Sequence, residues 1–108
     1  LLLAGQALDS LGQLPAADTL LQRGMRIRKQ YLPADHWALA STDGAWASHL
    51  ARLGRHAEAE RLLLSAYDRL VKARGADALP TKRVAQRLAD LMIRTARPSI
   101  AAKWRAKG

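Results

Sequence analysis

The sequence repeats itself at an interval of 42 residues, and this repeat constrains the fold more than any other feature. Gly12 and Gly54 lie 42 residues apart, as do Ala17 and Ala59, and an acidic residue follows each of these alanines. A third, weaker copy begins near residue 95. Self-similarity at a fixed interval is typical of stacked repeats, none of which can bury its apolar face alone. The predicted repeat units span about 1–34, 35–76 and 77–108.

Composition favours helices for these units. Apolar residues make up 49% of the 108-residue chain, with no Phe, and much of this content is Ala and Leu. That is enough for one small core, and the scarcity of β-branched side chains favours helix over strand. The chain has no cysteine, which excludes disulfides, thiolate nucleophiles and cysteine-ligated metals.

Helical periodicity is nearly continuous and is broken only at short connectors. Pro15 suits a first helical turn, and Pro33 marks the end of a helix. Asp35 is the predicted N-cap of the following helix, and Gly54 is its predicted end. The predicted fold class is therefore all-α. The predicted helices span about 1–12, 16–31, 35–53 (cap included), 56–73, 80 or 81 to 96, and 98–107.

Small residues recur where the helices of a hairpin should touch. Gly5, Ala47 and Ala89 share one register, and Gly24 and Ala66 share another. Because only small side chains let two helices approach closely, these positions predict helix contacts. Larger side chains at matching positions should form a continuous apolar ladder. The ladder positions are Ala4, Trp46 and Leu88; Leu8, Leu50 and Met92; and Leu20, Leu62 and Trp104.

Together these motifs resemble the tetratricopeptide repeat, in the 42-residue variety of kinesin light chain and of bacterial multidomain regulators such as serine/threonine kinases that carry these repeats. The middle unit carries the motif elements Gly54, Ala59-Glu60-Arg61-Leu62-Leu63 and Gly75-Ala76-Asp77. The first unit carries Gly12, Ala17-Asp18-Thr19-Leu20-Leu21 and Ala34-Asp35-His36. Departures from the family pattern are Trp37 and Leu79 in place of connector prolines, Ala78 in place of the histidine, and Ala96 in place of the turn glycine. The resemblance covers essentially the whole chain and implies a right-handed solenoid of about six helices, stacked as antiparallel hairpins.

The resemblance also implies a non-catalytic scaffold for protein–protein interaction, with a concave groove that holds a peptide or partner protein. The first helix of each hairpin lines this groove in the family. By register, the groove positions include Leu2, Gly44 and Ala51 as well as polar residues. The polar groove residues are Gln6, Asp9, Ser10, Ser48, Arg52, Arg83, Gln86, Asp90 and Arg94. The alternative is a solvated face that is used only for stacking.

Arg52 and Arg94 lie one interval apart on successive first helices, and Arg83 is predicted on the same side. The planar guanidinium group suits carboxylates and phosphates, so the partner is predicted to carry acidic groups. The alternative is that Asp9 and Asp90, on the same face, neutralise these arginines within the protein.

The net charge of +9 supports an alternative function, a helical module that binds nucleic acid or an anionic surface. Its strongest cluster is Arg23, Arg26, Arg28 and Lys29 on the second helix. The simpler interpretation is that arginine is the usual solvent-facing residue of these helices, and nucleic acid is the less favoured partner.

No residue pattern predicts an enzyme, a metal site or a cofactor. His36, His49 and His56 lack a convergent third ligand and are predicted to be structural. Glycine-rich phosphate loops and activated nucleophile motifs are absent from the sequence.

The chain ends also yield expectations. Leu1-Leu2-Leu3 lacks a basic leader, so it does not suit a signal peptide. We expect this apolar end to stack on a preceding repeat of a longer protein or on a second copy of the chain. No apolar run approaches the roughly 20 residues that span a bilayer. The expected location is cytoplasmic, and the alternative is the extracytoplasmic part of a membrane-tethered protein.

Overall fold

The computed structural model describes residues 2–108, with all side chains in that range except those of residues 2 and 10. Across these residues the chain forms six α-helices and no strand, which confirms the predicted all-α fold class. The helices are α1 (Leu2–Ser10), α2 (Leu14–Tyr31), α3 (Trp37–Arg52), α4 (His56–Arg74), α5 (Leu79–Arg94) and α6 (Pro98–Lys107). None of the helices described is both long and apolar enough to cross a membrane.

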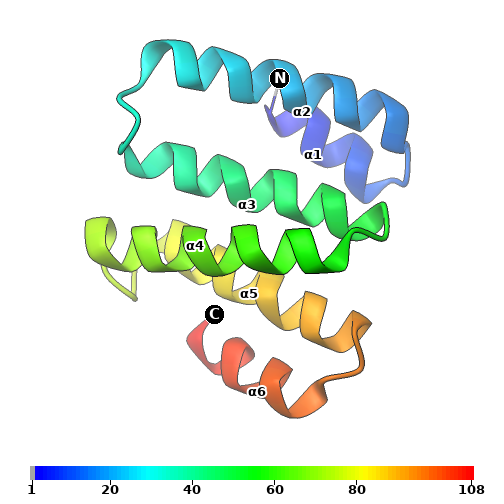
Figure 1. The fold of residues 1–108 in the computed structure, drawn as a ribbon, viewed down its shortest axis with the longest axis vertical. Coiled ribbons are helices and arrows are strands. Elements are labelled where there is room, and N and C mark those ends of the chain that lie inside the picture. The colour runs from blue at the N-terminus through cyan, green and yellow to red at the C-terminus, as the bar shows by residue number, and fades with distance from the viewer. Residues whose placement is uncertain (1) are drawn as a thin grey trace.

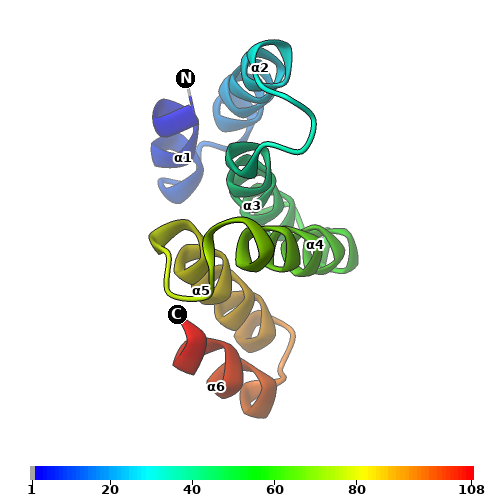
Figure 2. The same ribbon diagram turned by 90° about the vertical axis from the view of Figure 1, so that its left-hand side faces the viewer.

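Consecutive helices pair as hairpins, α1 with α2, α3 with α4 and α5 with α6 (Figure 1). The second helix of each hairpin contacts the first helix of the next, so that α2 lies against α3 and α4 lies against α5. The first helices also contact one another directly, because α3 touches both α1 and α5. Figure 2 shows α1, α3 and α5 following one another along the molecule, with α3 between the other two. Residues far apart in sequence therefore share one face.

The three turns inside the hairpins have the same backbone structure. In each, the residue after the turn donates its N–H to the carbonyl five residues earlier. These bonds are Gln13 to Leu8 (2.9 Å), Arg55 to Leu50 (2.9 Å) and Arg97 to Met92 (2.7 Å). The preceding residue has a positive φ in every turn, 80° at Gly12, 86° at Gly54 and 57° at Ala96. This bonding is the usual way in which a helix ends on a left-handed residue. The same backbone turn therefore recurs at the 42-residue interval that the sequence shows.

Ala96 occupies a left-handed conformation that costs a residue with a Cβ about 1–2 kcal/mol. We expect Ala96→Gly to stabilise the fold by about 0.5–1 kcal/mol, because the relief of strain exceeds the added flexibility of the unfolded chain. Urea denaturation measures the change. Ala102→Gly, at an exposed position inside α6, is the matched control and should destabilise by about 1 kcal/mol. An Ala96→Gly variant as unstable as the control would contradict the shared turn structure.

Three helix starts differ from the predictions. Helix α5 begins at Leu79 and not at residue 80 or 81, since Pro80 fits the first turn without needing an N–H. The N-cap of α3 is His36 and not Asp35, because the His36 Nδ1 accepts a hydrogen bond of 3.0 Å from the backbone N–H of Ala38. The imidazole of His36 thus caps the helix, where the carboxylate of Asp35 was expected to do so. Helix α2 begins at Leu14, two residues before its predicted start, since Pro15 fits the first turn without needing an N–H.

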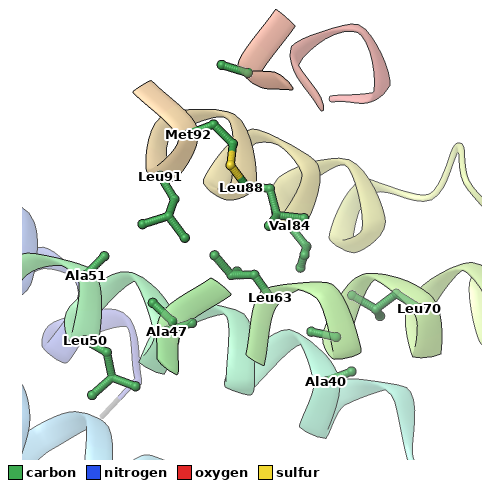
Figure 3. Close-up of a cluster of buried hydrophobic side chains, with 13 residues drawn as sticks. Ala40, Ala47, Leu50, Ala51, Leu63, Leu70, Val84, Leu88, Leu91 and Met92 are labelled. Atoms are coloured by element: carbon green, nitrogen blue, oxygen red, sulfur yellow. The ribbon is translucent and has the colours of Figure 1, made fainter. Parts of the chain in front are cut away.

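The core is centred on the second hairpin and α5 (Figure 3). Leu63 of α4 and Leu91 of α5 point toward one another there, and both are buried. The predicted small positions are also buried, namely Gly5, Ala47, Ala89, Gly24 and Ala66. At Gly5 the contact is close, since an added Cβ would lie 2.9 Å from Leu21 Cγ.

The apolar ladder is not continuous into the first hairpin. Leu50, Leu88 and Met92 are buried, whereas Ala4 is exposed. At the N-terminal end, Leu3 is 83% exposed, and Leu1 and the side chain of Leu2 lie outside the described residues. The expected association through this end stays a prediction.

Candidate functional site

The residues predicted to line a groove come from α1, α3 and α5, and the structure brings five of them together at one pocket. This pocket lies between α3 and α5 and has a volume of about 40 Å³. The predicted groove residues among its lining are Ser48, Ala51, Arg52, Asp90 and Arg94. The other lining residues are Leu63, Arg87 and Leu91. The lining thus combines charged and polar side chains with the buried Leu63 and Leu91.

The other predicted groove residues lie elsewhere. Gln6 is half-buried on α1, and Arg83 is exposed on α5. Gln86 is exposed on α5, where its Cγ lies close to Gly108 at the end of α6. The side chain of Ser10 lies outside the described residues. Gly44 is buried, and a Cβ added there would lie 3.2 Å from Val84 Cγ2, so this position serves helix contact and not a solvated face.

Arg87 belongs to the pocket but was not predicted. Its Nη1 donates a hydrogen bond of 2.6 Å to Ser48 Oγ, which joins α5 to α3. Arg87 is not part of the repeat, since its equivalent one interval earlier is Ala45. A different signal would have found it: residues 83, 87, 90 and 94 follow the four-three-four spacing of a single helix stripe. The charged stripe of α5 therefore marks the site better than the repeat register does.

Like charges crowd this site. Burial lowers the pKa of Arg87, and the neighbouring guanidinium groups of Arg52 and Arg83 lower it further, with Asp90 acting in the opposite direction. Burial and the charge of Arg94 likewise lower the pKa of Arg52. Over the residues that the structure describes, Arg83, Arg87 and Arg94 form no ion pair with a carboxylate. Arg83 and Arg94 are exposed, whereas Arg87 is partly buried and bonded to Ser48.

Asp9 was predicted to lie on the solvated face of the groove. This prediction is wrong, because Asp9 is only 2% exposed. Its carboxylate is bonded to Arg52 Nη1 and, at 2.7 Å, to the Nδ1 of the fully buried His49. His49 and Arg52 stand three residues apart on α3, so both reach α1 from one face. For Asp9, the structure thus favours the alternative in which acids neutralise arginine inside the protein.

The second ring nitrogen of His49 faces another carboxylate. His49 Nε2 lies 3.1 Å from Asp18 Oδ2 on α2. The imidazole of His49 therefore lies between two carboxylates that come from different helices of the first hairpin. His49, Asp9, Asp18 and Arg52 form a polar bridge that connects the first hairpin to α3.

The basic cluster of α2 is partly used for structure. Arg28 Nη1 donates to Thr42 Oγ1 at 2.8 Å and to the Ala38 carbonyl at 3.2 Å, so it ties α2 to α3. Arg23 and Arg26 are exposed and flank an open hollow that Ile27 also lines. Within residues 2–108, no three histidine, aspartate or glutamate side chains are arranged to hold a metal ion.

Comparison with known proteins gives no further guide, because no protein-family model and no curated protein matches this sequence.

Proposed function

We propose that the chain is a segment of a tetratricopeptide-like solenoid that acts as a non-catalytic binding module. Its partner is a protein with an acidic segment that lies across α3 and α5. The single observation that carries the proposal is the pocket where Arg52, Arg87 and Arg94 line one opening between these helices. The threefold turn structure and the contacts of α3 with α1 and α5 support the solenoid assignment.

The dimensions of the site suit an extended peptide. Neighbouring packed helices have axes about 10 Å apart, which an extended chain covers in about three residues. A peptide that crosses from α3 to α5 can therefore place one acidic side chain at the pocket and another near a neighbouring arginine. Arginine pairs with carboxylates through two parallel hydrogen bonds, which favours acidic segments over neutral ones.

Arg94→Ala is the variant that tests this proposal. Arg94 is exposed and forms no ion pair among the described residues, so its loss should leave the melting temperature nearly unchanged. We expect it to weaken the binding of acidic peptides about tenfold, which corresponds to one lost charge-assisted hydrogen bond pair. Fluorescence anisotropy with peptides chosen from a synthetic array of acidic sequences measures the change.

The matched control is Arg61→Ala, which removes the same charge from an exposed position on α4 away from the pocket lining. Arg52→Ala is unsuitable, because Arg52 also pairs with the buried Asp9. Equal weakening by Arg94→Ala and Arg61→Ala would show that only net charge matters. Loss of binding on substitution of Arg23 and Arg26 alone would favour the nucleic-acid or anionic-surface module.

A further inference from the structure

We infer that the pocket between α3 and α5 receives a phosphate monoester, the group of phosphoserine or phosphothreonine, on a segment of the partner protein. This inference rests on the proposed function and names the chemical group that the pocket selects. It is carried by the donors and the charge of the pocket, which distinguish a phosphoryl group from a carboxylate, and by its size, which excludes larger groups.

The pocket presents several hydrogen-bond donors. Arg52, Arg87 and Arg94 contribute guanidinium groups to its lining, and Ser48 contributes a hydroxyl. Ser48 Oγ accepts its hydrogen bond from Arg87, which leaves the hydroxyl proton free to donate to a ligand. The same bond fixes the orientation of Arg87. A phosphate monoester offers three acceptor oxygens, whereas a carboxylate offers two.

The charge of the pocket also exceeds what one carboxylate can balance. Its lining carries three guanidinium groups and a single carboxylate, that of Asp90. Part of the charge of Arg52 is taken up by Asp9, but Arg83 adds to the positive field beside Arg87. A phosphate monoester carries a charge of about −1.5 to −2 at neutral pH. Burial is the main cause of the lowered pKa values of Arg52 and Arg87, and a dianion would relieve the repulsion between guanidinium groups that adds to it.

The volume of the pocket limits what enters. One water requires about 10–15 Å³ of such space, so the observed 40 Å³ holds a few waters or one small group. A nucleobase or an aromatic ring is too large. A phosphoryl group at the tip of a serine or threonine side chain fits, while its peptide backbone remains outside, across α3 and α5.

The experiment uses one short peptide sequence in three versions, with phosphoserine, glutamate or serine at its centre. Inorganic phosphate is tested as a fourth ligand. Binding is followed at fixed ionic strength by ¹H–¹⁵N NMR, including the arginine Nε–Hε signals. We expect saturable shifts at Ser48, Arg87 and Arg94, and about tenfold tighter binding of the phosphoserine peptide than of the glutamate peptide. Arg94→Ala should weaken phosphopeptide binding, and Asp90→Asn should strengthen it by removal of a repelling carboxylate. Arg61→Ala should leave it unchanged.

Several results would overturn the inference. Equal affinity for the phosphoserine and glutamate peptides would show that the pocket does not select phosphate. Equal affinity for inorganic phosphate and the phosphopeptide would show that no peptide segment is recognised with the group. Equally tight binding of a single-stranded oligonucleotide, with the same shifts, would reassign the site to nucleic acid.

Different results would reject the proposed function and this inference. Acidic peptides that bind through Arg94 without a preference for phosphate keep the proposed function and reject the phosphate site. If no peptide of either kind perturbs α3 or α5, both proposals fail.

Discussion

Replacing His49 with alanine should lower the free energy of unfolding by about 3 kcal/mol, because it removes a fully buried side chain and one hydrogen-bond partner of the buried Asp9. His49 is fully buried, and its ring nitrogens lie 2.7 Å from Asp9 Oδ1 and 3.1 Å from Asp18 Oδ2. Its removal leaves the buried Asp9 with Arg52 as its remaining partner and opens a cavity. The loss of stability is limited to about this amount because Arg52 still bonds to the Asp9 carboxylate.

Urea denaturation of His49→Ala, Asp9→Ala and the double variant measures the coupling between these side chains. The double variant should lose less stability than the two single variants together, by about 1–3 kcal/mol, because it no longer buries a poorly paired carboxylate. His56→Ala is the control, since the Nδ1 of this half-buried histidine has no partner among the residues described. It should cost less than about 1 kcal/mol. Additive losses would contradict the polar bridge.

Replacing Leu63 with alanine should destabilise the fold by about 2–5 kcal/mol, the usual cost of a large-to-small change in a core. Leu63 is 1% exposed in the cluster that joins α3, α4 and α5, and it also lines the pocket between α3 and α5. The expected loss therefore combines lost apolar burial with a cavity between two hairpins.

Leu64→Ala is the matched control, because the adjacent leucine of the same helix is 41% exposed. It should cost less than about 1 kcal/mol. The comparison uses the same substitution one residue apart, so the helix propensity of the two variants is equal. Similar melting temperatures for the two variants would contradict the packing of Leu63 between the second hairpin and α5.

The sequence predicts the hairpins well, because their turns depend on local chemistry. A positive φ at residues 12, 54 and 96, followed by an N–H at the next residue that bonds back to the helix, requires only a suitable residue at each turn. The first two turn residues are glycines, which the 42-residue repeat identifies in the sequence. The buried alanines at 17, 59 and 101 likewise follow from one recurring helix contact.

The site was harder to predict, because its polar contacts differ from one repeat to the next. The aligned acids Asp18 and Glu60 both bond to the following hairpin, but Asp18 faces His49 and Glu60 faces Arg97. Asp9 shares a helix face with groove residues, yet its side chain is buried because His49 and Arg52 happen to lie opposite. Such pairings depend on which residues meet across helices, and a repeat register does not contain that information.

We propose that partners bind across α3 and α5 at the pocket that Arg52, Arg87 and Arg94 line. The most direct measurement is ¹H–¹⁵N NMR mapping of the tightest acidic or phosphorylated peptide on the whole chain. We expect saturable shifts confined to α3 and α5, with those of Ser48, Arg87 and Arg94 among the largest, and we expect these shifts to be lost in Arg94→Ala. Shifts concentrated on α2 around Arg23 and Arg26, with an unperturbed pocket, would contradict it.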